Sequence, residues 1–368
     1  MAGFSWQELF ERQRALYPGL RLKDQVKALH QSLLGCGHLI SDEAGSLRRL
    51  LQEWEDAPAQ ASPEPLSGGF SRLHLGAARA AGLSPRTAQR LFVLSARIVT
   101  GQEELFRGAL SEIESAVQSG RIPSDAEDRA FLAAYLPEAP RMLSHSEAFR
   151  ALYRPAYRVI SDDCAALLPL FCRIDQTLSS DGRLVLALDG GCAGGKSAAA
   201  AILRAVYGAP VIRMDDFFLR PEQRTEERFE APGGNVDRER FLAEAGPGLR
   251  SGTAFSYRRF DCGKMALGET VFVPAAKLIV VEGSYAMHPA LSGLYGLSAF
   301  VDTGWETRKR RILARNGARA AAFFERWVPL ENRYFEQTDA LARCALRLSL
   351  PDTPWRVPTD PPDGEGTA

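Results

Sequence analysis

Residues 184–203 read LVLALDGGCAGGKSAAAAIL. An apolar run leads into a glycine-rich segment, and that segment leads into a run of helix-forming residues. Residues 190–197 match the pattern G-x-x-x-x-G-K-S. They lie between a predicted buried strand and a predicted helix, which is the context that makes the pattern specific. The stretch therefore predicts a loop that binds the phosphates of a nucleoside triphosphate.

Each residue type in this loop has a mechanical role. Glycines let the backbone curl so that its N–H groups point at a phosphate, and the N-terminus of the following helix adds a positive field. Lys196 is predicted to reach the β- and γ-phosphates, and the Ser197 hydroxyl is predicted to ligate Mg²⁺. The predicted ATP-binding residues are Gly190, Gly191, Cys192, Ala193, Gly194, Gly195, Lys196 and Ser197.

Composition narrows the class of protein further. The chain has 368 residues and a formal net charge of zero, so we expect two domains and neither nucleic acid nor a membrane surface as a partner. The six cysteines are scattered without the spacing of a zinc site. The first residues lack the pattern of a signal peptide, and no apolar run has the length needed to cross a bilayer. We expect a cytoplasmic protein with reduced thiols.

The chain divides into four predicted parts. Residues 1–145 are predicted to form an all-α domain, because helix-start signals recur at Ser5, Ser84-Pro85 and Ser124 without strand alternation between them. Residues 146–179 are predicted to be a helical connection, and 180–351 the domain that carries the loop. Residues 352–368 are rich in Pro, Asp and Gly and are predicted to be a disordered tail. His145, in the helical part, is interpreted as a core or capping residue.

Apolar runs alternate with helical segments after the loop. Strands are predicted at 211–214, 278–281, 298–301 and 346–350, and a hairpin at 255–260 and 270–273. The predicted fold class is α/β, a P-loop NTPase-type parallel sheet with helices on both faces, preceded by the all-α domain. Ligands of such sheets lie beyond the carboxyl ends of the strands, so the residues that follow each strand are the candidates for chemistry.

Two acidic positions follow predicted strands. Asp215 and Asp216 come after the second strand, and one of them is expected to accept the proton of an attacking hydroxyl while the other caps the following turn. Glu282 ends the strand at 278–281. Because an unpaired buried carboxylate is costly, Glu282 is predicted to share the Mg²⁺ shell with Ser197.

A basic segment, RKRRILARNG at 308–317, follows the strand at 298–301. Such a segment is often a solvated helix face, but at this place in the fold it is able to close over a triphosphate. Arg311 and Arg315 lie four residues apart and so share one helix face. They are the predicted lid residues that stabilise charge on the transferred group, together with Lys196.

Further residues are candidates for contact with an acceptor molecule. Asp237 follows a Pro-Gly-Gly loop and is predicted either to cap a helix or to touch the substrate. Tyr257 and Arg259 lie on the predicted hairpin, and His288 follows Glu282 by a few residues. For His288 a structural role is the alternative.

Taken in order, these features resemble those of the uridine kinase-like P-loop kinases, a group related to nicotinamide riboside kinases, pantothenate kinases and phosphoribulokinases. The resemblance covers residues 183–350 and rests on the loop, Asp215-Asp216-Phe217-Phe218, Val281-Glu282-Gly283 and the arginine-rich segment. It implies transfer of the γ-phosphoryl group of ATP to a hydroxyl, with Asp215 as base and Glu282 supporting Mg²⁺. The partner would be a small-molecule hydroxyl acceptor.

Two departures concern the acceptor. Phe218 stands where uridine-cytidine kinases carry a tyrosine, and Asn316 where they carry an aspartate. Phe218 remains a predicted substrate-binding residue, and the segment Trp327–Tyr334 is loosely similar to nicotinamide riboside kinases. A nucleoside, by default uridine, is the expected acceptor. The alternatives are nicotinamide riboside, pantothenate or another hydroxyl compound, or a non-catalytic regulatory protein that binds ATP.

Overall fold

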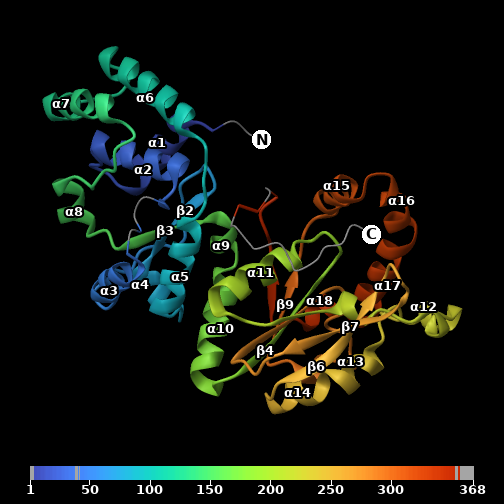
Figure 1. Ribbon diagram of the computed structural model, residues 1–368. Helices are drawn as coiled ribbons and strands as arrows, with labels where there is room; N and C mark the ends of the chain where they lie inside the picture. Colours follow the sequence, from blue (N-terminus) through green and yellow to red (C-terminus); the bar gives the residue numbers. More distant parts are fainter. Residues whose placement is uncertain (1–3, 38–39, 41, 353–354, 357–368) are drawn as a thin grey trace. The chain divides into compact units, whose positions relative to one another are not determined.

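The computed structural model describes residues 4–37, 40, 42–352 and 355–356 (Figure 1). Within this part of the chain, contacts define two compact units. The first unit holds the residues up to Ala165 together with Arg356, and the second holds Ala166–Trp355. The division falls inside the segment 146–179 for which the sequence predicts a connection. The predicted tail at 352–368 lies mostly outside the described residues.

Helices make up most of the first unit. They are α1 (Trp6–Leu16), α2 (Leu22–Leu34), α3 (Glu43–Trp54), α4 (Leu75–Ala80), α5 (Pro85–Ala96), α6 (Glu103–Gln118), α7 (Ala126–Tyr135) and α8 (Glu147–Tyr153). Ser5 and Ser84 cap α1 and α5 as predicted, by accepting bonds from the backbone N–H groups of Glu8 and Thr87. For α7 the cap is Asp125, one residue after the predicted Ser124.

A small sheet accompanies these helices, so the first unit is not all-α. Its antiparallel strands are β1 (Glu64–Pro65), β2 (Phe70–His74) and β3 (Tyr157–Ser161), in the order β1-β2-β3. Every residue of β2 is buried, including polar ones, so the strand lacks the alternation that marks a half-exposed strand in sequence. Strand β3 interrupts the segment 146–179 that the sequence predicts to be helical.

Buried charges lie in the core of this first unit. Arg72 on β2 forms an ion pair with Glu64 (Nη1–Oε1 2.9 Å), and His74 and Tyr17 also contact the Glu64 carboxylate. Arg72 lies over the Tyr157 ring. The charge of Arg72 is thus paired with that of Glu64, which offsets the cost of burying both.

The second unit is built on a parallel five-stranded sheet. Its strands are β4 (Leu184–Gly190), β5 (Val211–Arg213), β8 (Leu278–Glu282), β9 (Leu297–Val301) and β10 (Leu346–Leu348), in the order β10-β9-β4-β8-β5. All four neighbouring pairs are parallel. This architecture confirms the predicted α/β fold of the P-loop NTPase type.

Helices cover both faces of this sheet. Helices α10 (Leu168–Asp181) and α11 (Lys196–Tyr207) contact β4. The odd-numbered side chains Val185, Ala187, Ile279 and Val281 instead join a core with residues of α13 (Arg238–Glu244), α14 (Gly246–Ser251) and α17 (Val328–Thr338). The period of two along each strand directs alternate residues to these two layers.

The remaining elements extend from the sheet. Strands β6 (Phe255–Asp261) and β7 (Ala266–Val273) form the predicted hairpin, with an irregularity in register between Arg258 and Phe260. The basic segment forms α15 (Trp305–Asn316). Shorter helices of this unit are α12 (Glu226–Glu230), α16 (Ala320–Ala322) and α18 (Ala340–Arg343), whereas α9 (Asp162–Ala166) spans the boundary between the two units. Among the described residues, no helix is both long and apolar enough to span a membrane.

Candidate active site

The glycine-rich loop joins β4 to α11 at the carboxyl edge of the sheet. Gly190 has φ of 144°, and a Cβ there would lie 2.4 Å from the Val301 carbonyl oxygen. Gly195 has φ of 104° and directly precedes α11. Both conformations favour glycine, which explains why the loop carries glycine at its first and sixth positions.

Lys196 begins α11, and its side chain is buried. Its Nζ donates to the carbonyl oxygens of Gly190 (2.8 Å) and Gly191 (2.9 Å), and lies 3.4 Å from Ser284 Oγ. The ammonium group is therefore held over the loop, where a phosphate would need a counter-charge. Two backbone carbonyls and the Ser284 hydroxyl are its partners in this structure.

The structure brings together Ser197 and Glu282, the two residues for which the sequence predicts a shared Mg²⁺ shell. Ser197 Oγ donates to Glu282 Oε1 at 3.1 Å, and the Glu282 side chain is buried. Burial raises the pKa of Glu282, with Asp215 adding to the rise and Lys196 opposing it.

A hydroxyl beside a carboxylate matches the oxygen donors that Mg²⁺ prefers. No group of three or more His, Cys, Asp or Glu residues able to hold a metal ion is found in the described part of the chain. Mg²⁺ commonly uses only one or two carboxylates together with substrate phosphates, so Ser197 and Glu282 fit such an ion.

The two aspartates after β5 differ in environment. Asp216 is buried; it accepts a hydrogen bond from the Tyr257 hydroxyl (to Oδ2, 2.6 Å) and forms an ion pair with Arg259 (Nε to Oδ1, 3.1 Å). The Asp215 side chain is exposed, and its carboxylate has no hydrogen-bond partner among the residues that the structure describes. Surrounding protein raises the pKa of Asp215, Asp216 adds to this by repulsion, and Lys196 opposes it.

Helix α15 brings arginines to the loop, but the closest is not one of the two predicted. Arg311 Nη1 lies 3.4 Å from the Ala193 carbonyl oxygen, while Arg315 is exposed and lies over the Phe323 ring. Arg308 Nε donates to the Cys192 carbonyl oxygen at 3.0 Å. Position 308 lies one turn before 311 on the same helix, so the helical spacing could have indicated it.

Glu331, on α17, is a site residue that the sequence did not reveal. Its carboxylate accepts bonds from the Cys192 backbone N–H (2.9 and 3.0 Å), the Ser284 hydroxyl (2.6 Å) and Arg308 Nη2 (3.0 Å). It lies 139 residues from Cys192 along the chain, and no spacing rule connects the two. Its one signal is an acidic residue within the Trp327–Tyr334 segment.

Asp189, near the end of β4, supports the phosphate loop through hydrogen bonds. Its carboxylate is fully buried and accepts bonds from the backbone N–H groups of Gly190 (2.6 Å) and Met287 (2.8 Å) and from the Tyr334 hydroxyl (2.7 Å). These three bonds tie the end of β4 to the segment after β8 and to α17.

Phe218 belongs to a partly exposed aromatic surface. Its ring stacks on Trp327 at 6.4 Å between centroids, and Arg326 lies over both Trp327 and Phe229. Phe218 follows directly on the 3-10 turn Met214–Phe217 that contains both aspartates. The aromatic surface therefore starts three residues after Asp215.

Asp237 and His288 have structural partners. Asp237 caps α13 by accepting from the Arg240 backbone N–H at 3.0 Å. His288 Nδ1 accepts from the Ala290 backbone N–H at 3.1 Å, and burial lowers the pKa of His288 to about 4. The structure thus assigns a capping or turn role to both, the alternative that the sequence left open.

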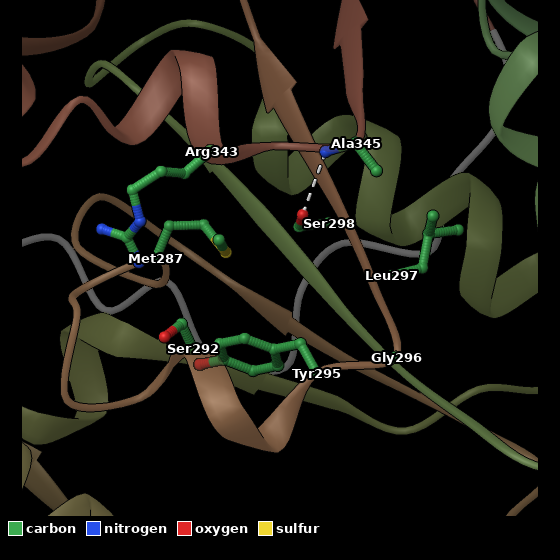
Figure 2. A pocket seen from close by; sticks show the side chains of 8 residues that line it. All are labelled: Met287, Ser292, Tyr295, Gly296, Leu297, Ser298, Arg343 and Ala345. Carbon is green, nitrogen blue, oxygen red and sulfur yellow. Dashed lines mark hydrogen bonds between the residues drawn. The ribbon is translucent and has the colours of Figure 1, made fainter.

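Cavities of the second unit include one beside the hairpin and one at the start of β9. One of about 330 Å³ is lined by Asp216, Tyr257 and Arg259, together with Arg213 and the hairpin residues Val271–Pro274. The other, of about 340 Å³, is lined by Met287, Tyr295, Ser298 and Arg343 among others (Figure 2). It lies where β9 begins, and Ser298 Oγ accepts from the Ala345 backbone N–H there. The phosphate loop meets β9 at Val301, the opposite end of that strand.

No protein-family model and no curated protein matches the chain. Among solved structures it is similar to a possible uridine kinase from Bacillus stearothermophilus, at 20% identity over 49% of this chain and 99% of that one, with a TM-score of 0.38. It is also similar to TT1252 from Thermus thermophilus, at 20% identity over 46% and 89% of the two chains, with a TM-score of 0.27. At these values the likeness carries no argument about activity.

Proposed function

We propose that the chain is an ATP-dependent phosphotransferase that moves the γ-phosphoryl group of ATP to the hydroxyl of a small molecule, with a nucleoside as the acceptor. The observation that carries the proposal is the grouping of Lys196, Ser197, Glu282 and Asp215 at the carboxyl edge of the parallel sheet. A protein that only bound nucleotide would need the first three. It would not need the carboxylate of Asp215, which has no hydrogen-bond partner among the described residues.

In the proposed reaction the acceptor hydroxyl loses its proton to Asp215 as its oxygen attacks the γ-phosphorus, and ADP leaves. Lys196, with arginines of α15, stabilises the charge on the phosphoryl oxygens. Mg²⁺ held by Ser197 and Glu282 would neutralise phosphate charge. Asp216 is committed to Tyr257 and Arg259, so it positions the turn on which Asp215 stands.

The aromatic surface supports a nucleoside as the acceptor. Phe218 and Trp327 present stacked rings beside the aspartate turn, and planar bases stack favourably on such rings. Because Phe218 lacks the hydroxyl of a tyrosine, this surface offers stacking without a polar contact at that position. Nicotinamide riboside, which also carries a planar ring and a ribose hydroxyl, is the second candidate.

The test is ADP release from ATP and Mg²⁺ in the presence of a panel of nucleosides, nicotinamide riboside, pantothenate and simple sugars. We expect acceptor-dependent ADP formation in the wild type, its loss in Lys196→Ala and its retention in Lys277→Ala. Lys277 is an exposed lysine just before β8 and is the matched control. Nucleotide binding without turnover on any acceptor would instead favour a non-catalytic regulator.

A further inference from the structure

The carboxylate of Glu331 lies in a set of donors suited to an anion. A backbone N–H of the phosphate loop, a hydroxyl and a guanidinium converge on it, from Cys192, Ser284 and Arg308. The Glu331 side chain is 6% exposed and that of Arg308 is 12% exposed. Loop amides, hydroxyls and arginine are also the groups with which proteins bind phosphoryl oxygens.

In this arrangement the polar groups of the phosphate loop are bonded to other groups of the protein. Lys196 bonds to the carbonyl oxygens of Gly190 and Gly191, so the ammonium group and the Cys192 amide both have internal partners. The Arg308 guanidinium lies against Gly191, where an added Cβ would be 2.0 Å from Cζ. Arg308 also lies over Trp305.

A triphosphate entering this loop brings several negative charges next to Glu331. The Cys192 N–H has one hydrogen and the Arg308 Nη2 edge is already occupied, so carboxylate and phosphate compete for the same donors. The Glu331 carboxylate and a phosphate bound to the same donors would also repel each other, and more strongly in a buried site than in water.

We propose that Glu331 is an internal anion that occupies the phosphate loop in the absence of nucleotide and is displaced by triphosphate. On displacement Arg308 passes from the carboxylate to the incoming phosphate, so that α15 and α17 separate at this point as the site fills. The inference rests on the proposed function only in that the loop binds nucleotide; it is independent of the acceptor. The opposing interpretation is that Glu331 is a permanent brace that holds the loop in its binding shape.

The two interpretations predict opposite effects of Glu331→Gln. This substitution keeps an oxygen acceptor for Cys192 and Ser284 but removes the charge. If Glu331 competes with phosphate, ATP binds Glu331→Gln at least fivefold more tightly than the wild type in calorimetry without acceptor, and so does inorganic tripolyphosphate. Glu336→Gln, an exposed position on the same helix, is the control and leaves affinity unchanged. Equal or weaker binding by Glu331→Gln overturns the inference.

A measurement on the wild type removes any dependence on the folding of the variant. Hydrogen exchange with and without ATP is followed in peptides covering 190–201 and 328–338. Displacement predicts that ATP slows exchange in the loop and speeds it at the start of α17, whereas a brace predicts slower exchange in both. If ATP binds and both segments are protected, the inference fails while the proposed function stands. If ATP binds neither the wild type nor Glu331→Gln, the inference and the proposed function both fail.

Discussion

The Tyr257 hydroxyl donates to Asp216 Oδ2 at 2.6 Å, which ties the hairpin to the turn that follows β5. Arg259, two residues further along the same strand, takes the other carboxylate oxygen. Both oxygens of Asp216 are thus occupied, while the neighbouring Asp215 is exposed. The hairpin therefore separates two adjacent aspartates into a structural one and one that is open to a ligand.

This separation predicts different outcomes for the two asparagine substitutions. Asp215→Asn removes the proposed base, and we expect acceptor-dependent ADP formation to fall by about 10²- to 10⁴-fold, the usual contribution of general base catalysis, with ATP affinity retained. Asp216→Asn removes the carboxylate that pairs with Arg259, so we expect this variant to have a lower thermal stability. Steady-state kinetics and melting curves of both variants test this. Undiminished turnover in Asp215→Asn would remove it as the base.

A second prediction concerns the buried ion pair of the first unit. Burial alone raises the pKa of Glu64, but bonds from His74, Gln13 and Tyr17 and the charge of Arg72 outweigh it and lower the pKa to about 2. Glu64→Gln leaves Arg72 buried without its counter-charge, and such a change costs about 3–5 kcal/mol of the free energy of unfolding.

The measurement for Glu64→Gln is labelling of the buried Cys36 thiol in increasing urea, mapped by mass spectrometry so that only the first unit is followed. The control is Arg48→Ala, which breaks an exposed pair with Asp42 (3.5 Å) and should change stability by less than about 1 kcal/mol. Equal effects of the two substitutions would contradict the prediction.

Features that depend on neighbouring residues could be predicted from the sequence, whereas contacts between distant segments could not. The loop, the strands that precede Asp215 and Glu282, and the hairpin were predictable because each rests on a pattern within a few residues. Ser197 and Glu282 were predicted to hold Mg²⁺ at the carboxyl edge of the sheet; the structure places their oxygens 3.1 Å apart, and the metal role stays a prediction. Arg308 and Glu331 were missed as site residues because their contacts with the loop depend on how α15 and α17 dock.

Strand β2 was missed for a different reason. Its residues Phe70–His74 are all buried, and Arg72 and His74 are polar residues that pair with Glu64 inside the core. A strand buried on both faces shows no alternation, and a buried charge looks like a surface residue in sequence. The interpretation of His145 as a core residue agrees with its bonds to Asp24 (2.8 Å) and the Tyr157 hydroxyl (2.6 Å).

His145 predicts how the stability of the first unit depends on pH. Burial lowers the pKa of His145 to about 4, with Arg72 and Lys27 adding repulsion and Asp24 opposing. In the unfolded chain the pKa is about 6.5. The unfolded state therefore binds more protons between pH 6.5 and 4, so stability is full above about pH 6.5 and declines by up to about 3 kcal/mol as pH falls to 4.

Urea midpoints from Cys36 labelling at pH 7.5, 5.5 and 4.5 test this dependence. His145→Gln cannot take up a proton, so we expect the variant to be less stable at pH 7.5 but to lose less stability on acidification than the wild type. His288 also has a pKa lowered to about 4, but it lies in the second unit and does not enter this readout. Parallel declines in wild type and His145→Gln would refute the assignment.

The last prediction concerns the first glycine of the phosphate loop. Gly190 has φ of 144°, and a Cβ there would lie 2.4 Å from the carbonyl oxygen of Val301 on the neighbouring strand β9. Backbone atoms of a central strand cannot yield as a flexible side chain can, so Gly190→Ala must distort the loop or part it from β9. The backbone conformation alone costs a non-glycine residue about 1–3 kcal/mol. We expect loss of ATP binding in calorimetry together with a lower melting temperature. Gly293→Ala is the matched control, because no atom lies within 4 Å of its added Cβ, and it should behave as the wild type. Retained ATP affinity in Gly190→Ala would show that the loop binds phosphate without the close approach to β9.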